Sequence, residues 1–465
     1  MDEPALRPMP PPDVAMPAEA DAVPPYAWLV LAMLMLANLL SFMDRYLMNV
    51  VGQPVKEELH LADWQLGMLN GTAFALSSTI VGLPVARLAA RINRASLIAA
   101  CMVVWSGMTM LCGLAGSLAQ MLLFRTGVGV GEAGSTPVSH ALIADYFPTA
   151  RRGTALAVYT IGMPFGALTG SVLGGIMIDR WGWRSAFLLL GGPGILVAVL
   201  LRLVVHEVPR GRYDPVPQTD AGSSILATAR LLLANRIARH IILGQTSAIM
   251  VAVAASTFYG PFLVRKFAIS YTQMGVLLSA SYLAGGTVGN LLGGIVADVA
   301  GRRDRRWYPW IAALGIALGC PLYLACYLQP TLAGTGVLMF AASVPALTYT
   351  APTFAVLHAL VSARTRATMV ALIGIVASLI GGGLGPLLGG LSIDLFAARH
   401  LPGFAAACPG GTAAPHAAAA QFALCRATLL AGTQSALIAW TPLFLWPAFH
   451  FWWASRQMGR PGSTD

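Results

Sequence analysis

Four ionisable residues lie well inside apolar runs of the sequence, where a membrane would surround them: Asp44, Arg45, Arg125 and Glu132. A charge at the centre of a bilayer costs at least about 2.5–3.5 kcal/mol, so each needs a partner or a function. Burial disfavours an ionised carboxyl and a neighbouring cation favours it. We therefore expect Asp44 and Glu132 to exchange protons while Arg45 pairs with whichever carboxylate is ionised.

A purely structural role is the alternative for these residues, because buried ion pairs also fix the packing of helices. Arg125 and Glu132 are seven residues apart, about two turns, and share one face of a helix. Arg125 falls near the outer end of its run, where it either contacts substrate or extends toward the interface.

The apolar runs that carry these residues define the class of protein. Of 465 residues, 57% are hydrophobic and 10% are charged, whereas soluble domains carry about 25% charged residues. Runs of about 20 apolar residues span a bilayer as helices. We place twelve: 28–51, 64–86, 96–116, 118–144, 154–178, 185–205, 241–264, 272–297, 310–328, 332–360, 367–395 and 428–453.

Arginine and lysine gather in the segments after even-numbered runs, which predicts that both termini are cytoplasmic in a bacterial-type inner membrane. This topology explains the net charge of +10 without nucleic acid. We predict a disordered leader over 1–25, a six-helix bundle over 26–206, a cytoplasmic linker over 207–238, a second bundle over 239–454 and a tail over 455–465.

An internal repeat relates the two halves. Residues Gly166, Gly170, Gly174, Gly175 and Asp179 recur 215 positions later as Gly381, Gly385, Gly389, Gly390 and Asp394. Six helices separate the copies, so both halves have the same orientation in the membrane. The sequence therefore predicts an all-α membrane protein with twelve transmembrane helices, in two six-helix bundles related by a parallel pseudo-two-fold repeat.

Several motifs resemble those of the major facilitator superfamily. The segment 294–303, with Gly294, Asp298 and Gly301, is similar to that family's cytoplasmic loop signature, although the first copy has Ala90 at the acidic position. The segments 125–132 and 381–390 resemble its fourth-helix and glycine-rich motifs. At the cytoplasmic helix ends beside the two copies of the loop signature we expect a charged gate, formed by Arg91, Arg94, Asp298, Arg302 and Arg303. Arginines in cytoplasmic loops also set the orientation of the chain in the membrane, whereas acidic residues contribute little to it, so Asp298 is the stronger indication of a gate.

A narrower resemblance is to the Spinster branch of that superfamily. It rests on Phe42-Met43-Asp44-Arg45-Tyr46, on Gly131-Glu132-Ala133 and on Trp183-Arg184-Ser185-Ala186-Phe187. The resemblance implies transport of lysolipid or sphingolipid-like amphiphiles, with coupling roles for Asp44, Arg45 and Glu132. An Asp-Arg pair also occurs in organic-anion symporters of the superfamily.

Substrate contacts are expected from aromatic and polar residues within the spans, although most such aromatics only pack against helices or lipid. The candidates beside Arg45 and Arg125 are Tyr46, Asn70, Tyr159, Phe258 and Tyr349. Cys408 and Cys425 share an outward loop, where oxidising conditions permit a disulfide.

The function predicted from these features is proton-coupled secondary transport of an amphiphilic lysolipid-like or organic anion. Uptake of a small polar organic acid and multidrug efflux remain alternatives. No metalloprotease, nucleophile-elbow or Walker motif is present in the sequence. We therefore expect no enzyme activity, cofactor or metal. The expected partners are the substrate, protons and membrane lipid, and the expected state is a monomer.

Overall fold

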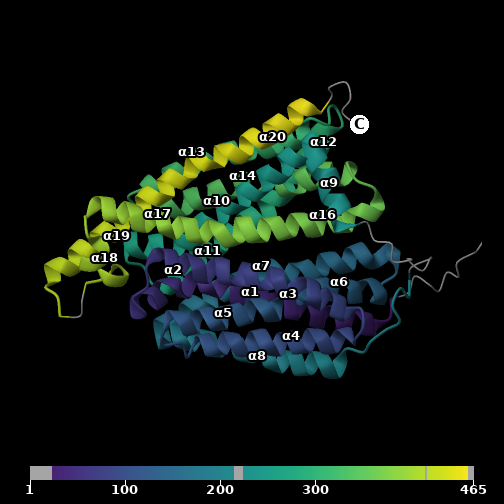
Figure 1. Ribbon diagram of the computed structural model, residues 1–465, viewed down its shortest axis with the longest axis horizontal. Coiled ribbons are helices and arrows are strands. Elements are labelled where there is room, and N and C mark those ends of the chain that lie inside the picture. The colour runs from purple at the N-terminus through teal and green to yellow at the C-terminus, as the bar shows by residue number, and fades with distance from the viewer. Residues whose placement is uncertain (1–22, 214–223, 414–415, 459–465) are drawn as a thin grey trace, which may run out of the picture.

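The computed structural model describes residues 23–213, 224–413 and 416–458. Two bundles of long helices lie one above the other in Figure 1, with the N-terminal half in purple to teal and the C-terminal half in teal through green to yellow. The predicted leader over 1–25 falls almost wholly outside the described residues, and so do the last seven residues of the predicted tail.

The N-terminal bundle contains eight α-helices and one π-helical segment. They are α1 (Pro25–Glu58), α2 (Asp63–Gly67), η2 (Met68–Thr72), α3 (Ala73–Ala89), α4 (Arg94–Cys112), α5 (Leu118–Glu132), α6 (Ser135–Tyr146), α7 (Thr149–Trp181) and α8 (Trp183–Val204). Three of these, α2, η2 and α3, follow one another directly and form a single membrane-length rod.

The C-terminal half is preceded by the short helix α9 (Ile225–Ala234). Its long elements are α10 (Arg236–Phe267), α11 (Tyr271–Leu283), η3 (Ala284–Gly289), α12 (Asn290–Gly301), α13 (Trp307–Leu328), α14 (Leu332–Ala346), α15 (Thr350–Ala359), α16 (Ala363–Val376), η4 (Ala377–Leu384), α17 (Gly385–His400), α19 (Ala419–Trp440), η6 (Thr441–Phe444) and α20 (Leu445–Gln457). Two small turns, α18 (Phe404–Ala407) and η5 (Pro409–Gly411), lie between α17 and α19.

Eleven helical rods among the described residues are long and apolar enough to cross a membrane. The one remaining predicted span, the fourth, over 118–144, is also helical, but Ala133 and Gly134 interrupt it between α5 and α6. A matching interruption separates α14 from α15 at Leu347–Tyr349, about 215 residues later, so the repeat seen in the sequence reappears as paired breaks. The twelve-helix, all-α prediction is confirmed.

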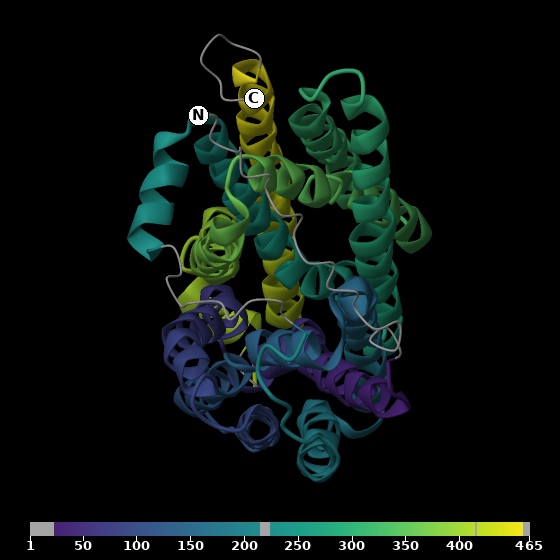
Figure 2. The same cartoon turned by 90° about the vertical axis from the view of Figure 1, so that its right-hand side faces the viewer.

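Both ends of the described chain, in α1 and α20, lie at the same end of the molecule, which Figure 2 views face on. We call this the inner end and the opposite one the outer end. Between the bundles, α7 packs beside α11, and α2 beside α17. Within the N-terminal bundle α7 packs along α1, which places the Asp44 segment of α1 against the other helices of its own half.

Candidate functional site

Arg45 and Glu132 form an ion pair between α1 and α5. The Nε of Arg45 donates to Oε2 of Glu132 at 2.6 Å. Glu132 is the last residue of α5, directly before the break at Ala133. Its other oxygen, Oε1, is buried without a hydrogen-bond partner among the described residues. This carboxylate therefore has one cation and one vacant acceptor position in a buried setting.

Asp44 forms a second pair with Arg125, also between α1 and α5. Arg125 Nη1 lies 3.3 Å from Oδ2 of Asp44, and the Thr109 hydroxyl of α4 donates to Oδ1 at 2.8 Å. Arg125 is 1% exposed, so it neither extends to the interface nor faces lipid. The sequence offered no signal for Thr109, because a hydroxyl in an apolar helix usually bonds to its own backbone.

The two pairs differ in how far their cations are exposed. The Arg45 side chain is 36% exposed while that of Glu132 is 0% exposed, and the guanidinium lies over the rings of Phe42 at 5.0 Å and Phe74 at 4.6 Å. Cations are attracted to aromatic faces. Arg45 thus has one side on a buried carboxylate and another side accessible between aromatic rings, a geometry in which an incoming anion can compete with Glu132.

Of the predicted substrate-contact residues, Tyr46, Asn70 and Tyr159 belong to the N-terminal half, and two of them carry buried polar atoms that lack partners among the described residues. Tyr46 packs edge-on against Tyr282 of α11, with ring centroids 4.6 Å apart. The Asn70 Nδ2 atom and the Tyr159 hydroxyl are buried without hydrogen-bond partners among the described residues. Such groups cost free energy unless a ligand or water satisfies them, so they are suited to contact a bound molecule.

The structure does not bring Phe258 and Tyr349 to this site. Phe258 is 1% exposed and packs against Gly389 inside the C-terminal bundle. Tyr349 stacks on Phe451 with centroids 5.8 Å apart. In this conformation both side chains serve packing, the usual role of aromatic residues in spans.

A buried charge network at the outer end joins the two bundles. Asp63 of α2 accepts from Lys56 of α1 at 2.6 Å and from Arg265 of α10 at 2.7 Å. Arg265 also donates to Gln53 at 3.1 Å and to Thr433 at 2.6 Å. The sequence singled out none of these residues, because the convergence of residues this distant in sequence is invisible without the fold. The outer end is therefore closed by a buried network in which Arg265 of the C-terminal half bonds to Asp63 and Gln53 of the N-terminal half.

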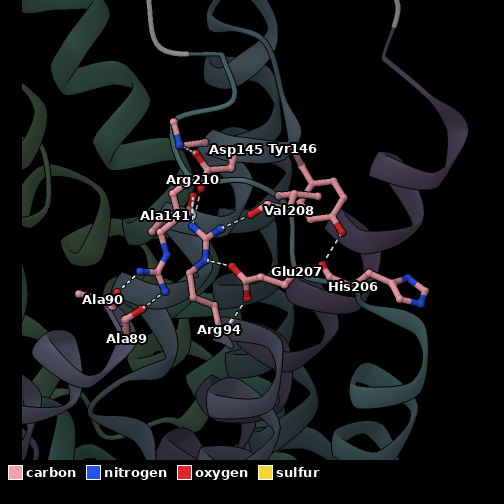
Figure 3. Close-up of polar contacts among 12 residues, drawn as sticks. Ala89, Ala90, Arg94, Ala141, Asp145, Tyr146, His206, Glu207, Val208 and Arg210 are labelled. Atoms are coloured by element: carbon pink, nitrogen blue, oxygen red, sulfur yellow. Dashed lines mark hydrogen bonds and ion pairs between the residues drawn. The ribbon is translucent and has the colours of Figure 1, made fainter. Parts of the chain in front are cut away.

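The five predicted gate residues lie at the inner end, which holds both termini. Arg94 is buried and bonds within its own half, to Asp145 at 2.5 Å and to Glu207 at 2.6 Å (Figure 3). Asp298 accepts from Tyr308 at 2.9 Å, also within one half. Arg91, Arg302 and Arg303 are exposed. A charged gate between halves at this end stays a prediction for the conformation that closes it.

The first residues after α8 are fixed to the N-terminal bundle. Arg210 donates to the carbonyls of Ala89, Ala90 and Ile92 at the end of α3, and the Gly211 amide donates to Asp145 at 2.9 Å (Figure 3). A cation at a helix C-terminus satisfies its free carbonyls and is favoured by the helix dipole. The beginning of the predicted linker is thus part of the bundle.

Cys408 and Cys425 form a disulfide that closes the outer loop between α17 and α19. The loop contacts the outer network, because Gly411 approaches the end of the Lys56 side chain. The other four cysteines are buried and free, as expected for small packing residues.

Known proteins resemble this chain along most of its length. The Major Facilitator Superfamily profile matches residues 34–386. An MFS-type efflux pump of Mycolicibacterium smegmatis is 33% identical over 80% of this chain and 85% of its own. A probable galactarate/D-glucarate transporter of Bacillus subtilis is 28% identical over 64% of this chain and 71% of its own.

Solved structures of a Spinster homolog are similar to this chain in both sequence and fold. A bacterial homolog of the human lysosomal transporter Spinster, in an inward-facing and unoccupied conformation, superposes with a TM-score of 0.85. It is 30% identical to this chain and covers 94% of it and 98% of its own length. The chain therefore belongs to the major facilitator superfamily, in its Spinster branch, and is a secondary transporter and not an enzyme.

Proposed function

We propose that the protein couples protons to the movement of an amphiphilic organic anion, such as a lysolipid, by alternating access. The observation that carries this proposal is the Arg45–Glu132 pair, whose cation is partly exposed and whose carboxylate is fully buried. An anion that binds Arg45 removes the counter-ion of Glu132. A carboxylate left unpaired in a buried setting takes up a proton instead of remaining charged.

The aromatic surroundings of Arg45 favour an amphiphile over a small polar acid. Phe42 and Phe74 flank the guanidinium, and a small hydrophilic acid would need more hydrogen-bonding cations than Arg45 offers. Arg125 is already paired with Asp44 and does not offer a second free cation. The likeness to a Spinster homolog and to an efflux pump supports an amphiphilic substrate. The Bacillus sugar-acid relative is the support for the polar-acid alternative.

Alternating access requires a second state in which the inner end closes. We infer that Arg91, Arg94, Asp298, Arg302 and Arg303 then form ion pairs between the halves, while the Asp63 network at the outer end separates. In the membrane the inner end faces the cytoplasm together with both termini, as the basic residues indicate. Each molecule contains a complete pair of bundles and acts as a monomer.

Proton coupling is tested in proteoliposomes that contain a pH-sensitive dye. Wild-type protein should change the lumenal pH when lysophosphatidylglycerol is added, and a Glu132→Gln variant should exchange substrate across the membrane without that change. Thr109→Val is the matched control, since it alters the site but removes no titratable group. A Glu132→Gln variant with wild-type pH dependence would exclude Glu132 from coupling.

The substrate class is tested by thermal stabilisation of the purified protein. Lysophosphatidylglycerol and lysophosphatidylcholine should raise the unfolding temperature, and an Arg45→Gln variant should lose most of the response to the anionic lysolipid. Stabilisation by galactarate and by no lysolipid would support the polar-acid alternative instead.

A further inference from the structure

The predicted linker contains one short helix, α9, that presents apolar side chains outward. Ile225, Leu226, Leu231 and Leu233 are each about half exposed, from 49% to 59%. A polar connecting segment in water has no reason to expose four large apolar side chains within ten residues. Exposure on this scale indicates that at least one face of α9 lies in an apolar environment.

One face of α9 is attached to the C-terminal bundle. Thr228 and Leu232 are buried and lie four residues apart, on one side of the helix. They face α16 and α10, which α9 contacts (Figure 1). The helix is therefore held in a fixed orientation, and its remaining faces point away from the bundle.

The stripe of α9 that lies opposite the buried pair combines apolar residues with a cation. Leu226, Arg230 and Leu233 are spaced four and three residues apart, so their side chains follow one another along the helix. All three are exposed. Long basic side chains on such a stripe extend to charged headgroups while their stems cover apolar surface. This pattern is typical of helices that lie in a membrane interface.

The position of α9 along the membrane normal is set by α10. Asn235 alone separates α9 from α10, which begins at Arg236 and is long and apolar enough to span the bilayer. Leu243, two turns into α10, is 47% exposed and faces the surroundings of a transmembrane helix. α9 therefore adjoins the inner end of a helix that has a lipid-facing surface, and Arg236 and Arg239 lie in the first turn of that helix.

We propose that α9 lies in the inner leaflet, with Leu226 and Leu233 among the acyl chains and Arg230 and Arg236 bound to anionic phospholipid headgroups. Charge complementarity selects this occupant, because the exposed cations beside the leucines match an anionic leaflet. A second copy of this chain would instead bring the same arginines together. The helix thereby fixes the start of the C-terminal bundle to the membrane surface, independently of what the protein transports.

The depth of α9 is measured on the full chain in nanodiscs. Leu226→Cys carries a fluorescent label, and Ala227→Cys, which is exposed but off the stripe, is the matched control. Unmodified protein gives the background, since its four free cysteines are buried. Spin-labelled acyl chains should quench the label at 226 strongly and the label at 227 weakly. Equal quenching at the two positions would overturn the proposal.

Headgroup binding is measured by adding phosphatidylglycerol to phosphatidylcholine nanodiscs that hold one copy each. The label at 226 should become more quenched as anionic lipid is added. The Arg230→Gln/Arg236→Gln variant should need about 25-fold more anionic lipid for the same increase in quenching, since each arginine strengthens the binding of anionic lipid about fivefold. Unchanged lipid dependence in this variant would exclude the headgroup contact. If the environment of the label at 226 became apolar only in discs that hold two copies, the occupant would be a second protein molecule, which would contradict the proposal.

Discussion

Asp179 and Asp394 make the same contact from opposite halves of the molecule. Asp179 of α7 accepts the backbone N–H groups of Tyr271 and Thr272 at 2.9 and 2.8 Å, at the start of α11. Asp394 of α17 accepts those of Asp63 and Trp64 at 3.2 and 2.9 Å, at the start of α2. Each half thus caps a helix N-terminus of the other, where a carboxylate satisfies free donors and is favoured by the helix dipole.

Neutralising either cap should weaken the outer closure. In Asp394→Asn and Asp179→Asn, charge-assisted hydrogen bonds become neutral ones, a loss of about 1–2 kcal/mol. This should shift the population toward the outward-open state by about 5- to 30-fold. Distances between spin labels on the outer ends of the bundles measure the shift. An unchanged distance distribution in both variants would show that the caps do not hold the closed state.

A side chain at Gly390 should also open the outer end. A Cβ there would lie 2.2 Å from the Asp63 carbonyl oxygen, and one at Gly175 would lie 2.3 Å from that of Tyr271. These contacts are with backbone, so the helices must separate. Gly390→Ala should therefore reduce transport at least tenfold while the protein still folds. Gly192→Ala in α8 is the control, because a Cβ there meets nothing within 4 Å.

Asp44 should contribute more to stability than its hydroxyl partner. Asp44→Asn leaves the buried Arg125 without its counter-ion, which costs about 3–5 kcal/mol. Thr109→Val removes one hydrogen bond, at about 1–2 kcal/mol. Tryptophan fluorescence during heating should show a clearly larger decrease in unfolding temperature for Asp44→Asn. Equal decreases would indicate that the pair with Arg125 contributes little.

The disulfide should stabilise the outer loop without being required for transport. The bonded cysteines are 17 residues apart, for which chain entropy predicts about 3 kcal/mol. A Cys408→Ser/Cys425→Ser variant should exchange amide hydrogens faster over 401–413, while its transport rate stays within about twofold of wild type. Complete loss of transport would mean that the loop is needed to form the outer closure.

Hydropathy and the repeat predicted the fold because both are local signals of the chain. An apolar run of membrane length has to be a helix, since lipid satisfies no backbone hydrogen bonds. The same physics predicted that Arg45 would pair with a carboxylate, and the structure shows it beside Glu132. Arg125 was ambiguous because position along a helix does not reveal which neighbour the side chain faces.

The outer network was beyond sequence reasoning for a different reason. Lys56, Asp63 and Arg265 lie at the ends of spans, where water is the default partner of a charge. Their burial depends on three helices from two halves meeting at one point. Phe258 and Tyr349 were predicted to contact substrate but pack inside the C-terminal bundle in this conformation. The sequence does not distinguish these cases, since an aromatic residue in a span packs equally well in a core or beside a cavity.

The covalently closed loop at the outer end also serves as a marker of sidedness. Reduction frees two thiols, at Cys408 and Cys425, that are buried beside the outer loop, and opening of the loop after reduction should expose them, whereas the other four cysteines lie within α4 and α13. A charged maleimide that does not cross lipid, added to intact cells that express the protein, should then modify the protein only at the cysteines of this loop. Labelling of the loop from outside the cell would thus test the orientation that the arginines predict, in which both termini face the cytoplasm, without any change to the sequence.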